Sequence, residues 1–142
     1  MNLEDKLKLE RYKLVTDRQK YFTNLAKDSF RSYIKVFTYL CAGAITLISA
    51  KSSLQIDTDL LLQLIKAIAI LITFLGAVSA GQIAFCLKRW YGFRRTETEI
   101  NSKCPPPEWW ACIFEGLYIL AIVISVVVTW FGSSKLGLII QS

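Results

Sequence analysis

Residues 67–87, AIAILITFLGAVSAGQIAFCL, form an apolar stretch that contains no charged side chain. A helix rises about 1.5 Å per residue, so about 20 apolar residues cross the hydrocarbon core of a bilayer. Water is absent from that core, and a helix satisfies all of its backbone hydrogen bonds within one segment. The stretch therefore predicts a transmembrane helix and makes this chain a membrane protein.

Two further stretches are apolar enough to span a bilayer. Residues 33–50 carry Lys35 close enough to their end for its amine to reach the interface, and residues 109–131 carry Glu115 as their one charge. The remaining ranges are an outer loop at 51–66, a basic loop at 88–108 and an outer tail at 132–142. The predicted fold class is an all-α membrane protein in which a long N-terminal helix precedes three transmembrane helices.

The basic residues predict the orientation of these spans. Of the 17 Lys and Arg residues, nine lie in residues 1–35 and five in residues 88–108. Cytoplasmic loops of membrane proteins carry an excess of Lys and Arg, so we expect both regions in the cytoplasm and the C-terminus outside. The net charge of +6 is then mainly a topology signal, and we expect no binding to nucleic acid.

Residues 1–32 predict a cytoplasmic amphipathic helix. Glu4 and Asp5 suit its first turn, and no Gly or Pro occurs before Gly43, so the helix can continue into the first span. Its apolar stripe can lie on the inner leaflet, or it can pack in a cytoplasmic bundle with copies of itself and with loop 88–108. Acidic and basic residues alternate along the polar face, which favours the bundle. The stripe consists of Leu3, Leu7, Leu14, Phe22, Leu25, Ala26, Phe30 and Tyr33.

Loop 88–108 combines a basic cluster with residues that end helices. Gly92 is predicted to end the second helix, and the three prolines at 105–107 are predicted to form a stiff entry to the third. Anchoring at the inner face of the membrane explains the basic cluster. The alternative is a phosphate-binding patch that contacts a partner protein or a nucleotide. The cluster consists of Lys88, Arg89, Arg94 and Arg95.

Two strongly polar residues, Glu115 and Gln82, are expected at membrane depth, each about 7 Å inside the cytoplasmic interface. Burial of such groups in lipid is costly, which makes them candidate functional residues. In one interpretation they bond to each other, or Glu115 pairs with Lys35, and the bond holds the three helices together. In the other, copies of Glu115 and Gln82 line a pore, with the hydroxyls of Thr73 and Ser79 along the same path.

Small residues on the second span favour close contact between helices. Gly76 with Ala80, and Ala77 with Gly81, have the spacing that allows backbones to approach, within one copy or between copies. Three helices can pack without leaving a central space, so a channel requires several copies around a symmetry axis. We therefore expect a homo-oligomer.

The composition argues against catalysis. The chain has no His, and its four Cys show no metal-binding spacing, so an imidazole base, a His-containing zinc site and a Ser-His-Asp triad are all excluded. We expect no enzymatic activity, no catalytic or metal-binding residues and no cofactor.

A charged amphipathic helix that leads directly into a pair of spans has a counterpart in a known family. Residues 10–50, ERYKLVTDRQKYFTNLAKDSFRSYIKVFTYLCAGAITLISA, and then 67–89, AIAILITFLGAVSAGQIAFCLKR, resemble the small SLATT-type transmembrane effectors of bacterial anti-phage systems. The resemblance covers about residues 1–100 and is one of architecture; the third span is an addition to the usual two. It implies assembly in the bacterial inner membrane, which the assembly opens or disrupts when a partner enzyme or its nucleotide product signals infection.

These expectations combine into one predicted function. The chain is expected to be an oligomeric pore-forming or membrane-disrupting effector of the bacterial inner membrane, gated from the cytoplasm by a partner protein or a nucleotide second messenger. The alternative is a non-conducting membrane anchor or regulatory subunit that recruits a soluble cytoplasmic enzyme. In both cases the remaining partner is membrane lipid.

Overall fold

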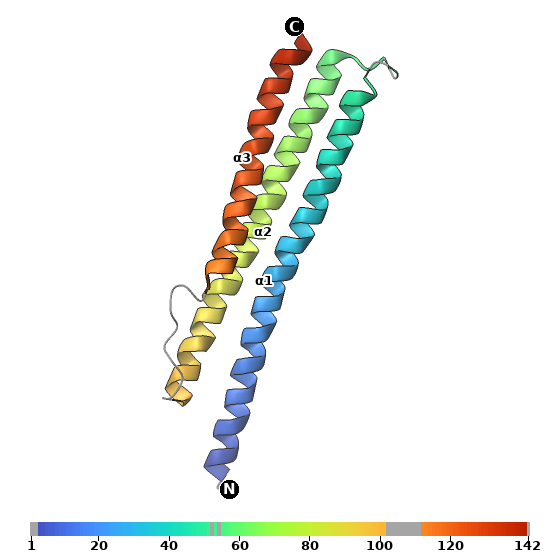
Figure 1. Cartoon of the computed structure of the whole chain (residues 1–142). Coiled ribbons are helices and arrows are strands. Elements are labelled where there is room, and N and C mark those ends of the chain that lie inside the picture. Colours follow the sequence, from blue (N-terminus) through green and yellow to red (C-terminus); the bar gives the residue numbers. More distant parts are fainter. Residues whose placement is uncertain (1–2, 52, 54, 102–111, 142) are drawn as a thin grey trace.

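Three long helices make up the computed structural model, which describes residues 3–51, 53, 55–101 and 112–141. They are α1 (Leu3–Ser49), α2 (Thr58–Ile100) and α3 (Ile113–Gln141). Consecutive helices run antiparallel, and α1 and α2 form a hairpin whose lower half extends beyond α3 (Figure 1). The part of the chain that the structure describes is thus an elongated helical hairpin with a third helix against one half of it.

α1, α2 and α3 are each long and apolar enough to cross a bilayer, which agrees with the three predicted spans. The N-terminal helix continues into the first span, as the sequence allows, and the two form one unbroken helix of 47 residues. Gly43 lies within that helix with open space around it, so neither its flexibility nor a steric conflict ends α1 there.

The helices also extend past the predicted spans. Residues 58–66 and 88–100 belong to α2, and residues 132–141 continue α3, although all three were predicted as loops or tail. The prediction that Gly92 ends the second helix is wrong, because contacts between α1 and residues 93–97 hold the backbone helical beyond it. Bilayer thickness sets a minimum helix length and does not determine where a helix ends. The prolines at 105–107 and the start of the predicted third span lie outside the described residues.

The seam between α1 and α2 has the spacing of a coiled coil. The buried positions of α2 are separated by three or four residues, or by sums of these steps, as expected for two helices that pack side by side over a long distance. On α1 the matching buried positions are Val15, Ala26, Ser29 and Tyr33. The buried residues of α2, which include Gly76 between α1 and α3, are Leu61, Ile65, Ala69, Ile72, Gly76, Ile83, Cys86 and Glu97.

Part of the predicted apolar stripe forms this seam. Phe22 stacks on Phe93 with ring centroids 5.8 Å apart and meets Phe85 edge-on at 6.4 Å. The stripe therefore packs against the segment predicted as loop 88–108, which is one element of the bundle interpretation. Leu7 and Leu14, by contrast, are 58% and 59% exposed on the same helix.

The third helix docks where Tyr33 lies between α2 and α3. The Tyr33 hydroxyl is 2.6 Å from Ser125 Oγ, and its ring is 3% exposed. One helical turn earlier, Phe30 stacks on Tyr118 with centroids 4.5 Å apart. Gly76 allows this approach, because a Cβ atom there would lie 3.1 Å from Val126 Cγ2 on α3.

We predict that Gly76→Leu destabilises the three-helix packing. The new side chain would overlap α3 and force it away, at a free-energy cost of about 2 kcal/mol, typical of an overpacked core. Gly116→Leu is the matched control, because nothing lies within 4 Å of a Cβ atom at that position. Thermal unfolding of the two variants in the same detergent measures the difference, and equal midpoints would contradict the packing described here.

Candidate functional site

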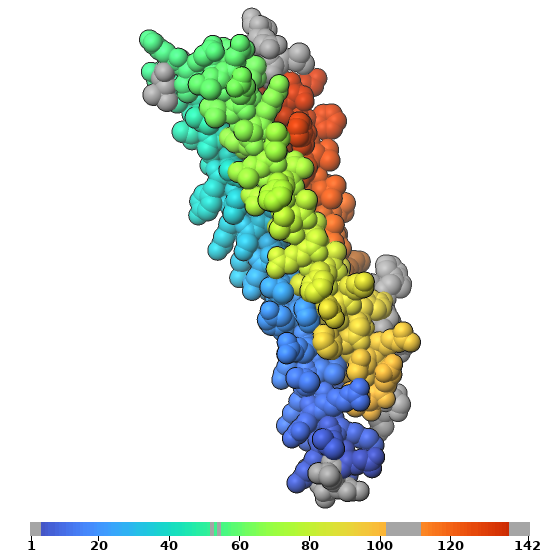
Figure 2. Space-filling model, turned by 180° about the vertical axis from the view of Figure 1, so that it is seen from behind, coloured from blue at the N-terminus to red at the C-terminus, as the bar shows by residue number. Residues whose placement is uncertain are grey.

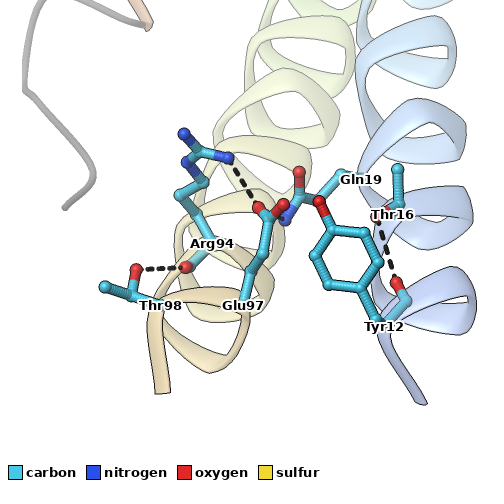
Figure 3. Close-up of polar contacts among 6 residues, drawn as sticks. All are labelled: Tyr12, Thr16, Gln19, Arg94, Glu97 and Thr98. Carbon is cyan, nitrogen blue, oxygen red and sulfur yellow. Dashed lines mark hydrogen bonds and ion pairs between the residues drawn. The ribbon is translucent and has the colours of Figure 1, made fainter. Parts of the chain in front are cut away.

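A buried carboxylate joins α1 and α2 near the end of the hairpin that carries the N-terminus. Glu97 is 4% exposed, and its Oε2 atom accepts hydrogen bonds from Gln19 Nε2 at 2.8 Å and from Arg94 Nη1 at 2.6 Å. The Tyr12 hydroxyl points toward the same carboxylate and donates to it (Figure 3). Two α1 side chains and one α2 side chain therefore converge on Glu97, and we call these four residues the Glu97 cluster.

The cluster stabilises the ionised form of Glu97. Burial by itself raises the pKa of this carboxyl. The hydrogen bonds from Gln19, Arg94 and Tyr12, together with the positive charge of Arg94, outweigh burial and hold the pKa below its ordinary value. A buried charge is tolerated when it is paired and hydrogen-bonded in this way. The Glu97 cluster is therefore an ionic connection between α1 and α2 at neutral pH.

Sequence reasoning missed this cluster, although the signal was present in the spacing. Glu97 follows Cys86 by 11 residues and Ile83 by 14, so it continues the coiled-coil positions of the second span. Gln19 lies four residues after Val15 and three before Phe22 on α1. If the spacing of buried positions is continued from each span into the polar segments, Gln19 of α1 and Glu97 of α2 both fall in the seam.

The four predicted contact cations do not form one patch. Arg94 is bound to Glu97, and Arg95 lies 3.8 Å from Glu99 with both side chains mostly exposed. Lys88 and Arg89 instead line a groove of about 560 Å³ on α2. Of the four cations, Lys88 and Arg89 are thus the two that form no ion pair within the described residues.

The polar residues predicted at membrane depth face in different directions. Thr73 faces α3. Its hydroxyl donates to the Ala69 carbonyl of its own helix at 2.8 Å and accepts from Trp130 Nε1 of α3 at 2.9 Å. Gln82 is exposed, and it forms no hydrogen bond within the described part of the chain. Nine residues, or about two and a half turns, separate Thr73 from Gln82, so they lie on opposite faces of α2. Ser79 is half-buried between these two directions.

Glu115 lies between helices. It borders a void of about 10 Å³, at the lower limit for one water molecule, together with Phe22 and Ala26 of α1 and Cys86 of α2. Across the described ranges, neither the predicted bond to Gln82 nor the predicted pair with Lys35 is present. Four residues predicted to line one pore therefore face at least three surroundings, and Gln82 is the exposed one among them.

The described residues contain no group of three His, Cys, Asp or Glu side chains that could hold a metal ion. Comparisons with protein-family models, with curated proteins and with solved structures found no match to this chain.

We predict that Glu97→Gln loosens the end of the hairpin. The substitution keeps the shape of the side chain but removes the charge-assisted bond to Arg94, a loss of about 1–3 kcal/mol for a buried pair. Amide hydrogen exchange across residues 88–100 should become faster. Glu99→Gln is the control, because that carboxylate is 66% exposed and lies 3.8 Å from its partner. Unchanged exchange in Glu97→Gln would show that the bonds contribute nothing to the hairpin.

The lowered pKa of Glu97 predicts a pH dependence of the same contact. Its stabilisation is complete above the ordinary carboxyl pKa of 4.5 and is lost as the pH falls through the lower pKa of the folded state. Wild type should therefore be more stable than Glu97→Gln at neutral pH, and the difference should disappear at a pH below the lowered pKa of Glu97. Thermal unfolding of both proteins at the two pH values measures this, and a difference that persists in acid would exclude an ionised Glu97 as its cause.

Proposed function

We propose that this chain is a pore-forming effector of the bacterial inner membrane that assembles from several copies and is gated from the cytoplasm. One observation carries the proposal: Gln82, about 7 Å inside the predicted span, is exposed on α2 and has no hydrogen-bond partner in the described part of its own copy.

An amide exposed to lipid is unfavourable, because hydrocarbon offers it neither donor nor acceptor. A second copy offers both, since an amide side chain donates and accepts at once. Gly81, the residue before Gln82, has open space around it, so the backbone of another copy can approach closely there. Figure 2 shows α2 running along one face of the molecule with α1 on one side and α3 on the other. We propose that copies meet along this face of α2 and that Gln82 side chains form a polar ring.

Continuous helices support gating from the cytoplasm. In the orientation predicted from the basic residues, the Glu97 cluster lies in the cytoplasm, and both α1 and α2 run without interruption from it into the predicted spans. A partner or nucleotide that displaces α1 near Tyr12 or Gln19 would move the helices at membrane depth as well. A role in anti-phage defence rests on the architectural resemblance to SLATT-type effectors.

A second function, a non-conducting anchor that recruits a soluble enzyme, is favoured by the interior of the bundle. Thr73 bonds to Trp130 of α3, and Tyr33 of α1 lies 2.6 Å from Ser125 Oγ of α3. Polar groups satisfied in this way within one copy are what a structural bundle requires. In this alternative the exposed Leu7 and Leu14 would contact the recruited enzyme.

We predict that Gln82→Leu weakens self-association and abolishes ion conduction. Each bond between membrane helices contributes about 1–2 kcal/mol, so loss of the ring should reduce association at least about tenfold. Photobleaching step counts in nanodiscs and ion flux from proteoliposomes measure the two effects.

The matched control is Gln63→Leu, an exposed amide on α2 that lies before the predicted span. Gln82→Asn should retain assembly, because a shorter amide still donates and accepts. A wild-type monomer in lipid that conducts no ions under any trigger would exclude the pore and favour the anchor.

A further inference from the structure

A groove on α2 has the composition of a site for a phosphate-bearing lipid headgroup. It encloses about 560 Å³ and is lined by Phe85, Lys88, Arg89, Gly92, Phe93 and Thr96. These residues recur every three or four positions, so they form one face of a single helix. Gly92 leaves the middle of this face open, because no atom lies within 4 Å of a Cβ atom placed there.

The predicted span 67–87 places the groove at the level of the headgroups. Residues 67–87 carry no charge and match the thickness of the hydrocarbon core, and Lys88 and Arg89 come directly after them. At about 1.5 Å per residue, both cations lie within about 3 Å of the end of the core, and a headgroup layer is about 5–8 Å thick. Phe85 is 50% exposed on the membrane side of this boundary, where acyl chains begin.

Within the described ranges, no carboxylate pairs with the two cations in the groove. Arg94 and Arg95 each lie beside a carboxylate, whereas Lys88 and Arg89 form no ion pair with any described residue. The Arg89 guanidinium lies 5.3 Å from the centroid of the Phe85 ring, which holds it over the groove and leaves its N–H groups for a phosphate. Phe93 is fixed in turn by its stack on Phe22 of α1.

We propose that this groove binds one anionic phospholipid, with its phosphate on Lys88 and Arg89, its headgroup over Gly92 and its acyl chains along Phe85. General attraction of basic residues to an anionic surface would require only the charges. A binding site also requires the groove, so filling the groove while keeping both charges distinguishes the two. This inference does not depend on the proposed pore.

The test is native mass spectrometry of delipidated protein titrated with phosphatidylglycerol and, separately, with phosphatidylcholine. Wild type should bind the anionic lipid about tenfold more tightly, as expected for a charge-assisted pair of contacts. Gly92→Leu and Arg89→Gln should each remove most of this preference. Their matched controls, Gly43→Leu at another open glycine and Arg95→Gln at an exposed arginine of the same helix, should retain it. Gln82→Leu should retain it as well, which separates this test from that of the pore.

Three results would overturn the proposal. Equal affinity for the two lipids would remove the basis for an anion site. If Arg95→Gln and Arg89→Gln lose the preference for phosphatidylglycerol equally and Gly92→Leu retains it, the lipid is attracted by charge alone and no groove is involved. Displacement of phosphatidylglycerol by millimolar inorganic phosphate or ATP would identify the ligand as a soluble phosphate rather than a lipid.

Discussion

Lipid tails are as apolar as a leucine side chain, so helices inside a bilayer are held together by close packing and hydrogen bonds and not by the hydrophobic effect. In this chain that constraint is met at Tyr33, whose ring lies between α2 and α3 beside Gly76 and whose hydroxyl bonds with Ser125. Beyond the predicted span the same seam is held by stacked rings such as Phe22 and Phe93 and by the Glu97 cluster. One continuous line of contacts between α1 and α2 thus joins two environments in which different forces act.

The fold was predictable from the sequence to the extent that it depends on the bilayer. Twenty apolar residues require a helix, and the lack of Gly or Pro before Gly43 allows α1 to be continuous. The end of α2 was not predictable in this way. Gly92 favours a helix end locally, but packing of Phe93 and Glu97 against α1 overrides that preference. Such contacts depend on the register between two helices distant in sequence, which local residue patterns do not give.

The candidate site shows a related limit. Counting residues from the end of a span gives the depth of Gln82 and Glu115, but depth alone does not say toward which neighbour a side chain points. Thr73 and Gln82 were assigned to one path although nine residues place them on opposite sides of a helix. The spacing of Thr73 and Gln82 in the sequence was therefore sufficient to place them on different sides of the helix. The position of Glu115 between α1 and α2 did not follow from spacing, because it depends on how α3 docks.

The pairing of Gln19 with Glu97 restricts how the hairpin can move. If α2 slid along α1 by one heptad toward the turn, Glu97 would lie opposite Ala26 and its charge would be buried without donors from α1. Sliding is therefore the motion that the seam opposes most strongly. Separation of the two helices is different, since it admits water to the carboxylate as the bonds break. We therefore expect a force at the free end of the hairpin to separate α1 from α2 around the Tyr33 contact and not to slide one helix along the other.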